Sequence, residues 1–334
     1  MINFRDIIGQ EHIVNHFVNA IDTQKISHAY ILNGEAGTGK KTLARIFTAA
    51  VQCEGEDIGN KPCGECHSCR QCLTDNHPDI KWITHDKPNT ISVDDVREQL
   101  NGDIIIRPYS SRYKIYIIDE AQKLNIAAQN AILKTIEEPP KYAIILLLTN
   151  NAAAFLPTII SRCVLLNIRA VGEKQIVKYL MEKEIIPDYT AKIAAAFSGG
   201  NLGKAISLGT SEHFNQLRDN VIQVVSHIKD METAELLGTV KMVEAYKLEI
   251  DDYINVMIMW YRDVLLYKAA QDANSLLFKE AFSEIKRQAA KCSFHGLQEI
   301  LEVLDMAKVR IKANVNFDLT IQLMFLTINE RMKG

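Results

Sequence analysis

The first half of the chain alternates short apolar runs with stretches in which apolar residues recur at helical spacing. The apolar runs predict buried strands at residues 28–33, 80–84, 114–119, 143–150 and 164–168. Between them we expect helices at residues 40–52, 93–100 and 126–138, the last of which is stopped by Pro139 and Pro140. Strands that alternate with helices are typical of a parallel sheet covered on both faces, so this half is expected to form an α/β domain.

The strand pattern ends near residue 171. Residues 172–208 favour a few short helices, interrupted by Ser198-Gly199-Gly200-Asn201, and residues 211–332 carry apolar side chains at helical spacing almost throughout. A chain of 334 residues is too long for one ordinary core. We therefore predict three domains: an α/β domain over residues 1–169 and two helical domains, over residues 170–208 and 209–334.

Composition narrows the class of protein. With 47% hydrophobic and 24% charged residues, the chain is expected to be soluble and globular. Its apolar runs are too short to cross a bilayer and its first residues show no secretory signal, so we expect a cytoplasmic protein without membrane contact. A net charge of −3 excludes a generally basic nucleic-acid binder, although it allows a local basic patch.

A glycine-rich segment, Gly34-Glu-Ala-Gly-Thr-Gly39-Lys40, lies between a predicted strand and a predicted helix. This is the setting that a phosphate-binding loop requires, because its glycines let backbone N–H groups turn towards phosphate oxygens beside a helix N-terminus. A plain glycine turn would also explain Gly34 and Gly39, but the flanking elements favour the phosphate loop. The candidate nucleotide-binding residues here are Gly34, Gly37, Thr38, Gly39, Lys40, Lys41 and Thr42.

Two acidic residues, Asp119 and Glu120, end the strongest predicted strand. In phosphate-loop proteins such a pair holds Mg²⁺ and orients the attacking water, so both are candidate catalytic residues. The position after Lys40 should carry a hydroxyl ligand for Mg²⁺, but it holds Lys41. Thr42 lies about 100° further round the helix and should not substitute. We therefore expect weak ATP or ADP binding, inefficient hydrolysis, and vestigial roles for Asp119 and Glu120.

Five of the seven cysteines lie within residues 53–72. In a reducing cytosol, this spacing favours a metal site over disulfides. The thiolates of Cys53, Cys63, Cys66 and Cys69 suit tetrahedral Zn²⁺ in a structural role. Cys72 continues the three-residue step and His67 lies inside the cluster, so either could replace a ligand.

The order of motifs resembles the AAA+ clamp-loader subunits of bacterial DNA polymerase III, over the first 210 residues or so and more weakly to the end. Besides the phosphate loop and the cysteine module, the resemblance rests on Phe4-Arg5-Asp6-Ile7-Ile8-Gly9-Gln10, His28-Ala29-Tyr30, His77-Pro78-Asp79, Tyr113-Lys-Ile-Tyr-Ile-Ile-Asp-Glu-Ala121, Leu133-Lys-Thr-Ile-Glu-Glu-Pro-Pro140 and Ser161-Arg162-Cys163. It implies an AAA+ domain with an inserted zinc module, a small helical lid and a helical collar that joins subunits.

Two kinds of subunit share that plan, the gamma/tau motor and delta-prime. The motor has Gly-Lys-Thr where this chain has Gly39-Lys40-Lys41, and an arginine in the lid where this chain has Gly203. Lys204 is adjacent, but one step off that helix face. Both departures remove groups that would touch Mg·ATP, and the resemblance therefore points to the delta-prime kind.

The resemblance also implies roles for single residues. In these assemblies the arginine that corresponds to Arg162 reaches across a subunit boundary as an arginine finger, a permanently charged donor in trans. Thr149 and Asn150 match the sensor-1 position, although they could equally cap the turn that follows. In relatives the helix after Asp119 faces the central channel, so Gln129 and Lys134 are expected on an exposed face.

Together these features predict a clamp-loader stator: an enzymatically silent subunit that works with gamma/tau and delta subunits, and through them with the sliding clamp and primed DNA. Two alternatives stay open. One is an active gamma/tau-type ATPase that tolerates Lys41, which turnover by the isolated chain would reveal. The other is a zinc-stabilised AAA+ adaptor outside replication, which binding partners without any polymerase subunit would reveal.

Overall fold

The computed structural model describes residues 3–55 and 57–333, and it divides into two compact units. The first unit runs to Ile176 and regains residues 198–204, while the second holds residues 177–197 and the chain from Ala205 onward. Residues 170–208 are thus shared between the units, and the three-domain division stays a prediction.

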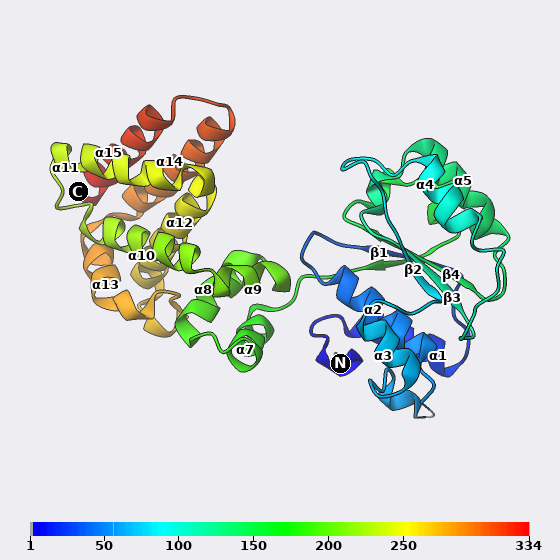
Figure 1. The fold of residues 1–334 in the computed structure, drawn as a ribbon. Helices are drawn as coiled ribbons and strands as arrows, with labels where there is room; N and C mark the ends of the chain where they lie inside the picture. The colour runs from blue at the N-terminus through cyan, green and yellow to red at the C-terminus, as the bar shows by residue number, and fades with distance from the viewer. Residues whose placement is uncertain (1–2, 56, 334) are drawn as a thin grey trace. The chain divides into compact units, whose positions relative to one another are not determined.

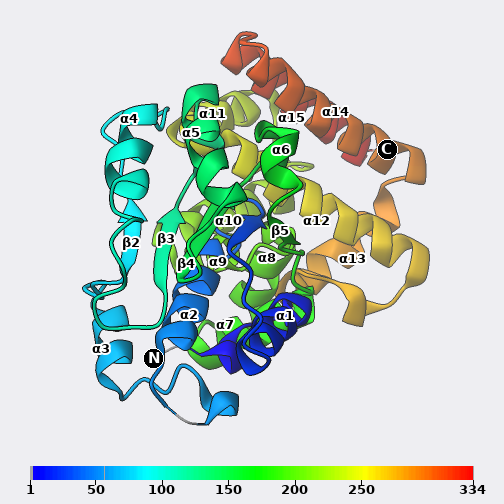
Figure 2. The same ribbon diagram turned by 90° about the vertical axis from the view of Figure 1, so that its right-hand side faces the viewer.

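The first unit is built on a five-stranded sheet in which every neighbouring pair is parallel. The strand order is β2-β3-β4-β1-β5. Figure 2 labels β2, β3, β4 and β5 of this sheet. This confirms the predicted α/β class, and each predicted strand is found within two residues of its expected ends. The strands are β1 (Ala29–Asn33), β2 (Ile80–Ile83), β3 (Lys114–Ile118), β4 (Ala143–Thr149) and β5 (Val164–Asn167).

Helices cover both faces of this sheet (Figure 1). Phe17, Tyr30 and Phe47 form the aromatic centre of the core under one face, with the rings of Phe17 and Phe47 stacked 4.0 Å apart. Ile31, Tyr116 and Ile132 belong to the core under the other face. The helices of this unit are α1 (Glu11–Asp22), α2 (Lys40–Gln52), α3 (His67–Leu73), α4 (Val93–Val96), α5 (Ile126–Glu137) and α6 (Pro157–Ile160).

Two local features depart from the sequence-based expectations. The helix predicted at residues 93–100 is α-helical only over α4 and continues as a π-helical turn, Arg97–Asn101. Gln129 is not on an exposed face, because its side chain is 3% exposed and bonds the carbonyls of Leu124 and Ala154. It also accepts the N–H of Leu156 at 2.8 Å. Gln129 therefore fastens α5 to the segment before α6, an interaction that the helical pattern alone does not reveal.

The second unit is helical, as the sequence predicts, and has its own core. Its longest helix, α12, buries Tyr253, Trp260 and Tyr261 completely. Among the residues that the structure describes, no helix is long and apolar enough to cross a membrane. From residue 173 onward the helices are α7 (Glu173–Lys183), α8 (Asp188–Ser198), α9 (Leu202–Thr210), α10 (Glu212–His227), α11 (Thr233–Val243), α12 (Ile250–Ala270), α13 (Phe282–Lys291), α14 (Phe294–Lys312) and α15 (Phe317–Lys333).

Candidate functional site

The glycine-rich segment forms a tight loop between β1 and α2. Gly34 bonds the end of β4, with its N–H 3.0 Å from the carbonyl of Thr149. The Thr38 hydroxyl donates to the carbonyl of Glu35 at 2.8 Å and closes the loop on itself. Gly39, with φ of 90°, adopts the left-handed backbone that side chains disfavour, and it leads directly into Lys40 at the start of α2. These contacts fix the loop shape that the sequence predicts.

A cavity of about 590 Å³ opens beside this loop, at the carboxyl ends of β3 and β4. Parallel strands bring these ends to one edge of the sheet, which is the usual ligand position in such folds. Eight predicted site residues line the cavity, namely Gly37, Gly39, Lys40, Lys41, Thr42, Asp119, Glu120 and Asn150. Three others do not: Gly34 and Thr38 shape the loop, and Thr149 is fully buried.

Gln122 lines the cavity as well, and the sequence did not single it out. Its side-chain amide oxygen lies 3.2 Å from the Thr149 hydroxyl and 3.4 Å from the backbone nitrogen of Asn150, and it accepts a hydrogen bond from both. It thereby sets the end of β4 against the turn after β3. No motif marks this glutamine, because its partners lie 27 and 28 residues further along the chain.

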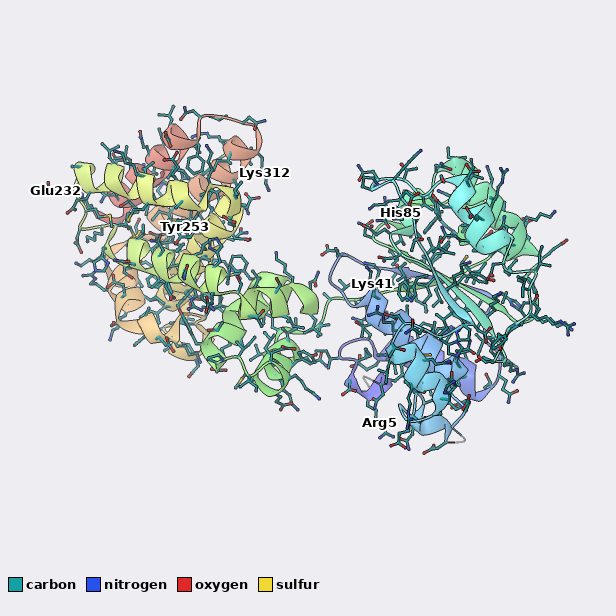
Figure 3. All side chains as sticks on the ribbon, in the orientation of Figure 1. Arg5, Lys41, His85, Glu232, Tyr253 and Lys312 are labelled. Atoms are coloured by element: carbon teal, nitrogen blue, oxygen red, sulfur yellow. The ribbon has the colours of Figure 1, made fainter. Side chains whose placement is uncertain are left out.

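Both lysines of the loop are already engaged by the protein. The Lys40 ammonium donates to the carbonyls of Gly34, at 2.5 Å, and Glu35, at 2.7 Å. Burial lowers its pKa, although Asp119 and Glu35 act in the opposite direction. The Lys41 ammonium lies 2.7 Å from a carboxylate oxygen of Asp119. Figure 3 labels Lys41 at the start of α2. The chain thus places a positive charge of its own on the acidic end of β3.

The second acid is paired in the same way. Glu120 bonds Lys123 at 2.7 Å, and Lys123 also donates to the carbonyl of Pro88. Mg²⁺ requires several oxygen ligands in near-octahedral geometry. Here the residue that should carry a hydroxyl carries an ammonium, and each carboxylate is neutralised by a lysine. These residues therefore do not fit Mg²⁺ as they stand.

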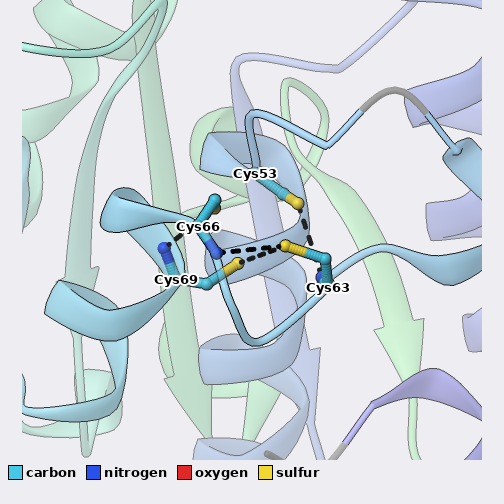
Figure 4. Close-up of side chains that lie close together, drawn as sticks. All are labelled: Cys53, Cys63, Cys66 and Cys69. Atoms are coloured by element: carbon cyan, nitrogen blue, oxygen red, sulfur yellow. Dashed lines mark hydrogen bonds between the residues drawn. The ribbon is translucent and has the colours of Figure 1, made fainter.

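Four cysteines converge between α2 and α3 (Figure 4). The sulfur atoms of Cys53, Cys63, Cys66 and Cys69 all lie within 4.8 Å of one another, and those of Cys63 and Cys69 are 3.9 Å apart. Ligands about 2.3 Å from a tetrahedral zinc ion stand about 3.8 Å from each other, so the spacing suits this ion. Among the described residues, neither Cys72 nor His67 belongs to a group of this kind.

Backbone N–H groups hold the sulfur atoms in place. The Cys66 N–H donates to Cys63 and the Cys69 N–H to Cys66, at 3.4 and 3.3 Å. N–H groups of Cys66 and Glu65 lower the pKa of the Cys63 thiol to about 6. Burial raises the pKa of the Cys53 and Cys69 thiols. Donors aimed at sulfur favour thiolates, and four clustered thiolates can bind a metal ion.

Arg162 lies just beyond α6, on the surface. Its guanidinium pairs with Glu137, the last residue of α5, at 3.1 Å, and donates to the Thr158 carbonyl at the same distance. It also lies 3.3 Å from the Ser161 hydroxyl. The side chain is 42% exposed and does not line the cavity of its own chain. The geometry therefore leaves the guanidinium accessible from outside this subunit.

Comparison with known proteins assigns these features to one family. Residues 9–172 match the family model described as DNA polymerase III, delta subunit. The chain is 33% identical to the gamma subunit of DNA polymerase III from Buchnera aphidicola, over 75% of this chain and 67% of that one. It is 28% identical to the delta-prime subunit from Bacillus subtilis, over 96% of each. The chain belongs to the delta-prime/gamma/tau family of clamp-loader subunits of DNA polymerase III.

The other comparisons add detail without separating delta-prime from gamma or tau. The chain is 30% identical to B. subtilis tau over 92% of its own length, but it spans only 58% of that protein. It is also similar to a solved structure of a gamma subunit-related protein from Thermotoga maritima, with 21% identity, coverage of 97% and 99%, and a TM-score of 0.41.

The phosphate loop also contacts residues 198–204, which are distant in the sequence but belong to the same compact unit. Asn201 caps α9, because its carbonyl oxygen accepts the Lys204 N–H at 3.1 Å. Its amide nitrogen donates to the carbonyl of Ala36 at 2.7 Å. The N–H of Gly203 donates to the carbonyl of Gly37 at 3.0 Å. A β-carbon on residue 203 would lie 2.3 Å from that carbonyl oxygen, so this contact excludes any side chain here.

Proposed function

We propose that this chain is a delta-prime-type stator of the clamp loader, which supports a neighbouring motor and does not hydrolyse ATP. The observation that carries the proposal is the 2.7 Å ion pair between Lys41 and Asp119. Lys41 occupies the Asp119 carboxylate, which a motor needs as a ligand for its metal ion. The same site also lacks the hydroxyl ligand. The Gly203 contact supports the same conclusion, since an arginine cannot stand there without a shift of the backbone.

The stator acts through Arg162. In a clamp-loader ring, this side chain points at the γ-phosphate bound by the adjoining gamma/tau motor and stabilises the charge that develops during phosphoryl transfer. The exposed guanidinium and its ion pair with Glu137 support this role, because such a surface ion pair is weak and can be exchanged for phosphate. The partners are gamma/tau and delta subunits, and through them the sliding clamp and primed DNA.

Reconstitution with the motor and delta subunits tests this assignment. Replacing Arg162→Ala is expected to slow hydrolysis at the adjoining motor site by about a thousandfold or more. The clamp-dependent ATP turnover of the complex then falls by the fraction that the adjoining motor site contributes to it. Arg169→Ala, seven residues away and also exposed, is the matched control and should leave turnover unchanged. Equal turnover by the Arg162→Ala and wild-type complexes would refute the finger.

The cysteine cluster is assigned to structural zinc. Four thiolates at tetrahedral spacing support zinc over magnesium or calcium, which prefer oxygen ligands. The ion would join the end of α2 to the start of α3 and order the segment between them. It supplies no step of the reaction.

One observation favours the gamma/tau alternative. Identity to the gamma subunit from Buchnera aphidicola subsp. Acyrthosiphon pisum, 33% over 75% of this chain, exceeds identity to B. subtilis delta-prime, 28% over 96% of this chain. ATP turnover by the purified chain decides between the two. A stator shows none above background, whereas an active motor hydrolyses ATP and loses that activity in Asp119→Ala.

A further inference from the structure

The cavity beside the phosphate loop carries two positive charges that belong to the chain itself. Lys40 and Lys41 both line it, and the carbonyls that hold Lys40 are those of the loop. The Lys41 side chain is 62% exposed, so it can turn between Asp119 and a ligand without breaking packing. Two lysines and the start of α2 make this an anion site.

A metal ion has little to bind in this cavity. To bind Asp119, Mg²⁺ must first displace the Lys41 ammonium, which lies 2.7 Å from the carboxylate. The ion then has this carboxylate as a ligand but lacks the hydroxyl ligand of a motor site. The Lys41 ammonium therefore already provides the positive charge at the position that Mg²⁺ usually occupies. A phosphate group beside them meets ammonium donors in the place where Mg²⁺ normally bridges two phosphates.

We propose that this cavity binds the diphosphate of a nucleoside diphosphate without Mg²⁺, with the ammonium groups of Lys40 and Lys41 in place of the metal. Nucleoside diphosphates suit the site better than triphosphates, because two lysines balance less of the triphosphate charge. Mg²⁺ weakens the binding or leaves it unchanged, since it competes with the lysines for the same oxygens. The proposal concerns this chain's own cavity and is independent of Arg162.

Calorimetric titration of the full chain with ADP, in excess EDTA and then in Mg²⁺, tests the proposal. The wild-type Kd should be as low in EDTA as in Mg²⁺, or lower. Lys41→Thr restores the hydroxyl and frees Asp119, so its binding should become stronger in Mg²⁺ by about tenfold or more. Lys41→Met removes the charge without adding a ligand and should bind weakly in both buffers.

The outcomes are distinguishable. Residue 41 is mostly exposed, so all three proteins should fold, and equal thermal stability without nucleotide checks this. A wild-type chain that requires Mg²⁺, or that fails to bind ADP in either buffer, overturns the proposal. The inference shares the Lys41–Asp119 ion pair with the stator assignment. The stator assignment has separate tests, namely Arg162→Ala in the reconstituted complex and ATP turnover by the purified chain, so failure of one proposal is distinguishable from failure of the other.

Discussion

At the scale of single residues, the most informative position is Gly203. Its N–H bonds the carbonyl of Gly37, and a β-carbon at residue 203 would overlap that oxygen. The backbone of Gly37 therefore fills the space into which a side chain at residue 203 would project. A glycine at residue 203 is therefore a requirement of close packing.

Gly203→Ala tests this packing. The variant must push α9 away from the phosphate loop, and it should lower the free energy of unfolding by about 1–3 kcal/mol. Gly238→Ala is the matched control, because residue 238 also lies in a helix but faces open space. That change should stabilise the protein by about 0.5–1 kcal/mol, since alanine favours helix more than glycine. Urea denaturation measures both, and a Gly203→Ala variant as stable as wild type would contradict the contact.

Some single-residue features could be predicted and others could not. The missing hydroxyl at Lys41 and the four zinc-type cysteines are visible in the sequence, because each depends on residue type and short spacing. The position of Gln122 and the burial of Gln129 are not, since both depend on partners from segments that meet only in the folded chain. Thr149 shows the same limit: it was expected at the site near the end of a predicted strand, yet it is buried and does not line the cavity.

At the scale of elements, the four clustered cysteines lie between α2 and α3 and could bind a metal ion there. The sequence left Cys72 and His67 open as ligands. In the structure Cys72 lies apart from the four-sulfur group and lines a small pocket with Arg45, His77 and Trp82.

Zinc content of the purified chain tests the ligand set. Wild type and Cys72→Ser should each carry about one zinc per chain, while Cys69→Ser should carry almost none, because three thiolates hold the ion far less tightly. Metal analysis after dialysis measures this. Zinc loss in Cys72→Ser, or full zinc in Cys69→Ser, would show that the ligands differ from the four named here.

Elements were also the level at which the sequence was most informative. The five strands and the helices predicted at residues 40–52 and 126–138 were found within about two residues of their expected ends, because each is an apolar run or period bounded by glycine, proline or charge. The helices from residue 172 onward were expected only in general terms, without bounds. The π-helical turn after α4 was missed. It has the same apolar spacing as an α-helix over so few residues, and only the backbone hydrogen bonds distinguish the two.

At the scale of the whole molecule, the two units have separate hydrophobic cores, and each contains one of the two tryptophans. Trp82 lies in β2, beside the guanidinium of Arg45 at 5.5 Å. Trp260 is fully buried in α12 and donates to Gln288 at 2.9 Å. Each unit therefore has its own fluorescent reporter.

Single-tryptophan variants test whether zinc stabilises one unit or both. In Trp260→Phe, where Trp82 reports, adding Cys69→Ser should lower the urea midpoint, because metal binding contributes directly to folding. In Trp82→Phe, where Trp260 reports, the same cysteine change should leave the midpoint in place. Parallel shifts of both reporters would mean that the two cores unfold together.

The ion pair of Lys41 and Asp119 has a consequence for the charge of this chain's own site. A motor site gains and loses a divalent ion and a phosphoryl group in every round, so its electric field alternates. A cation that is covalently part of the polypeptide cannot dissociate, and its concentration at the carboxylate does not depend on the ionic composition of the cell. The positive charge beside Asp119 is therefore a fixed part of this chain.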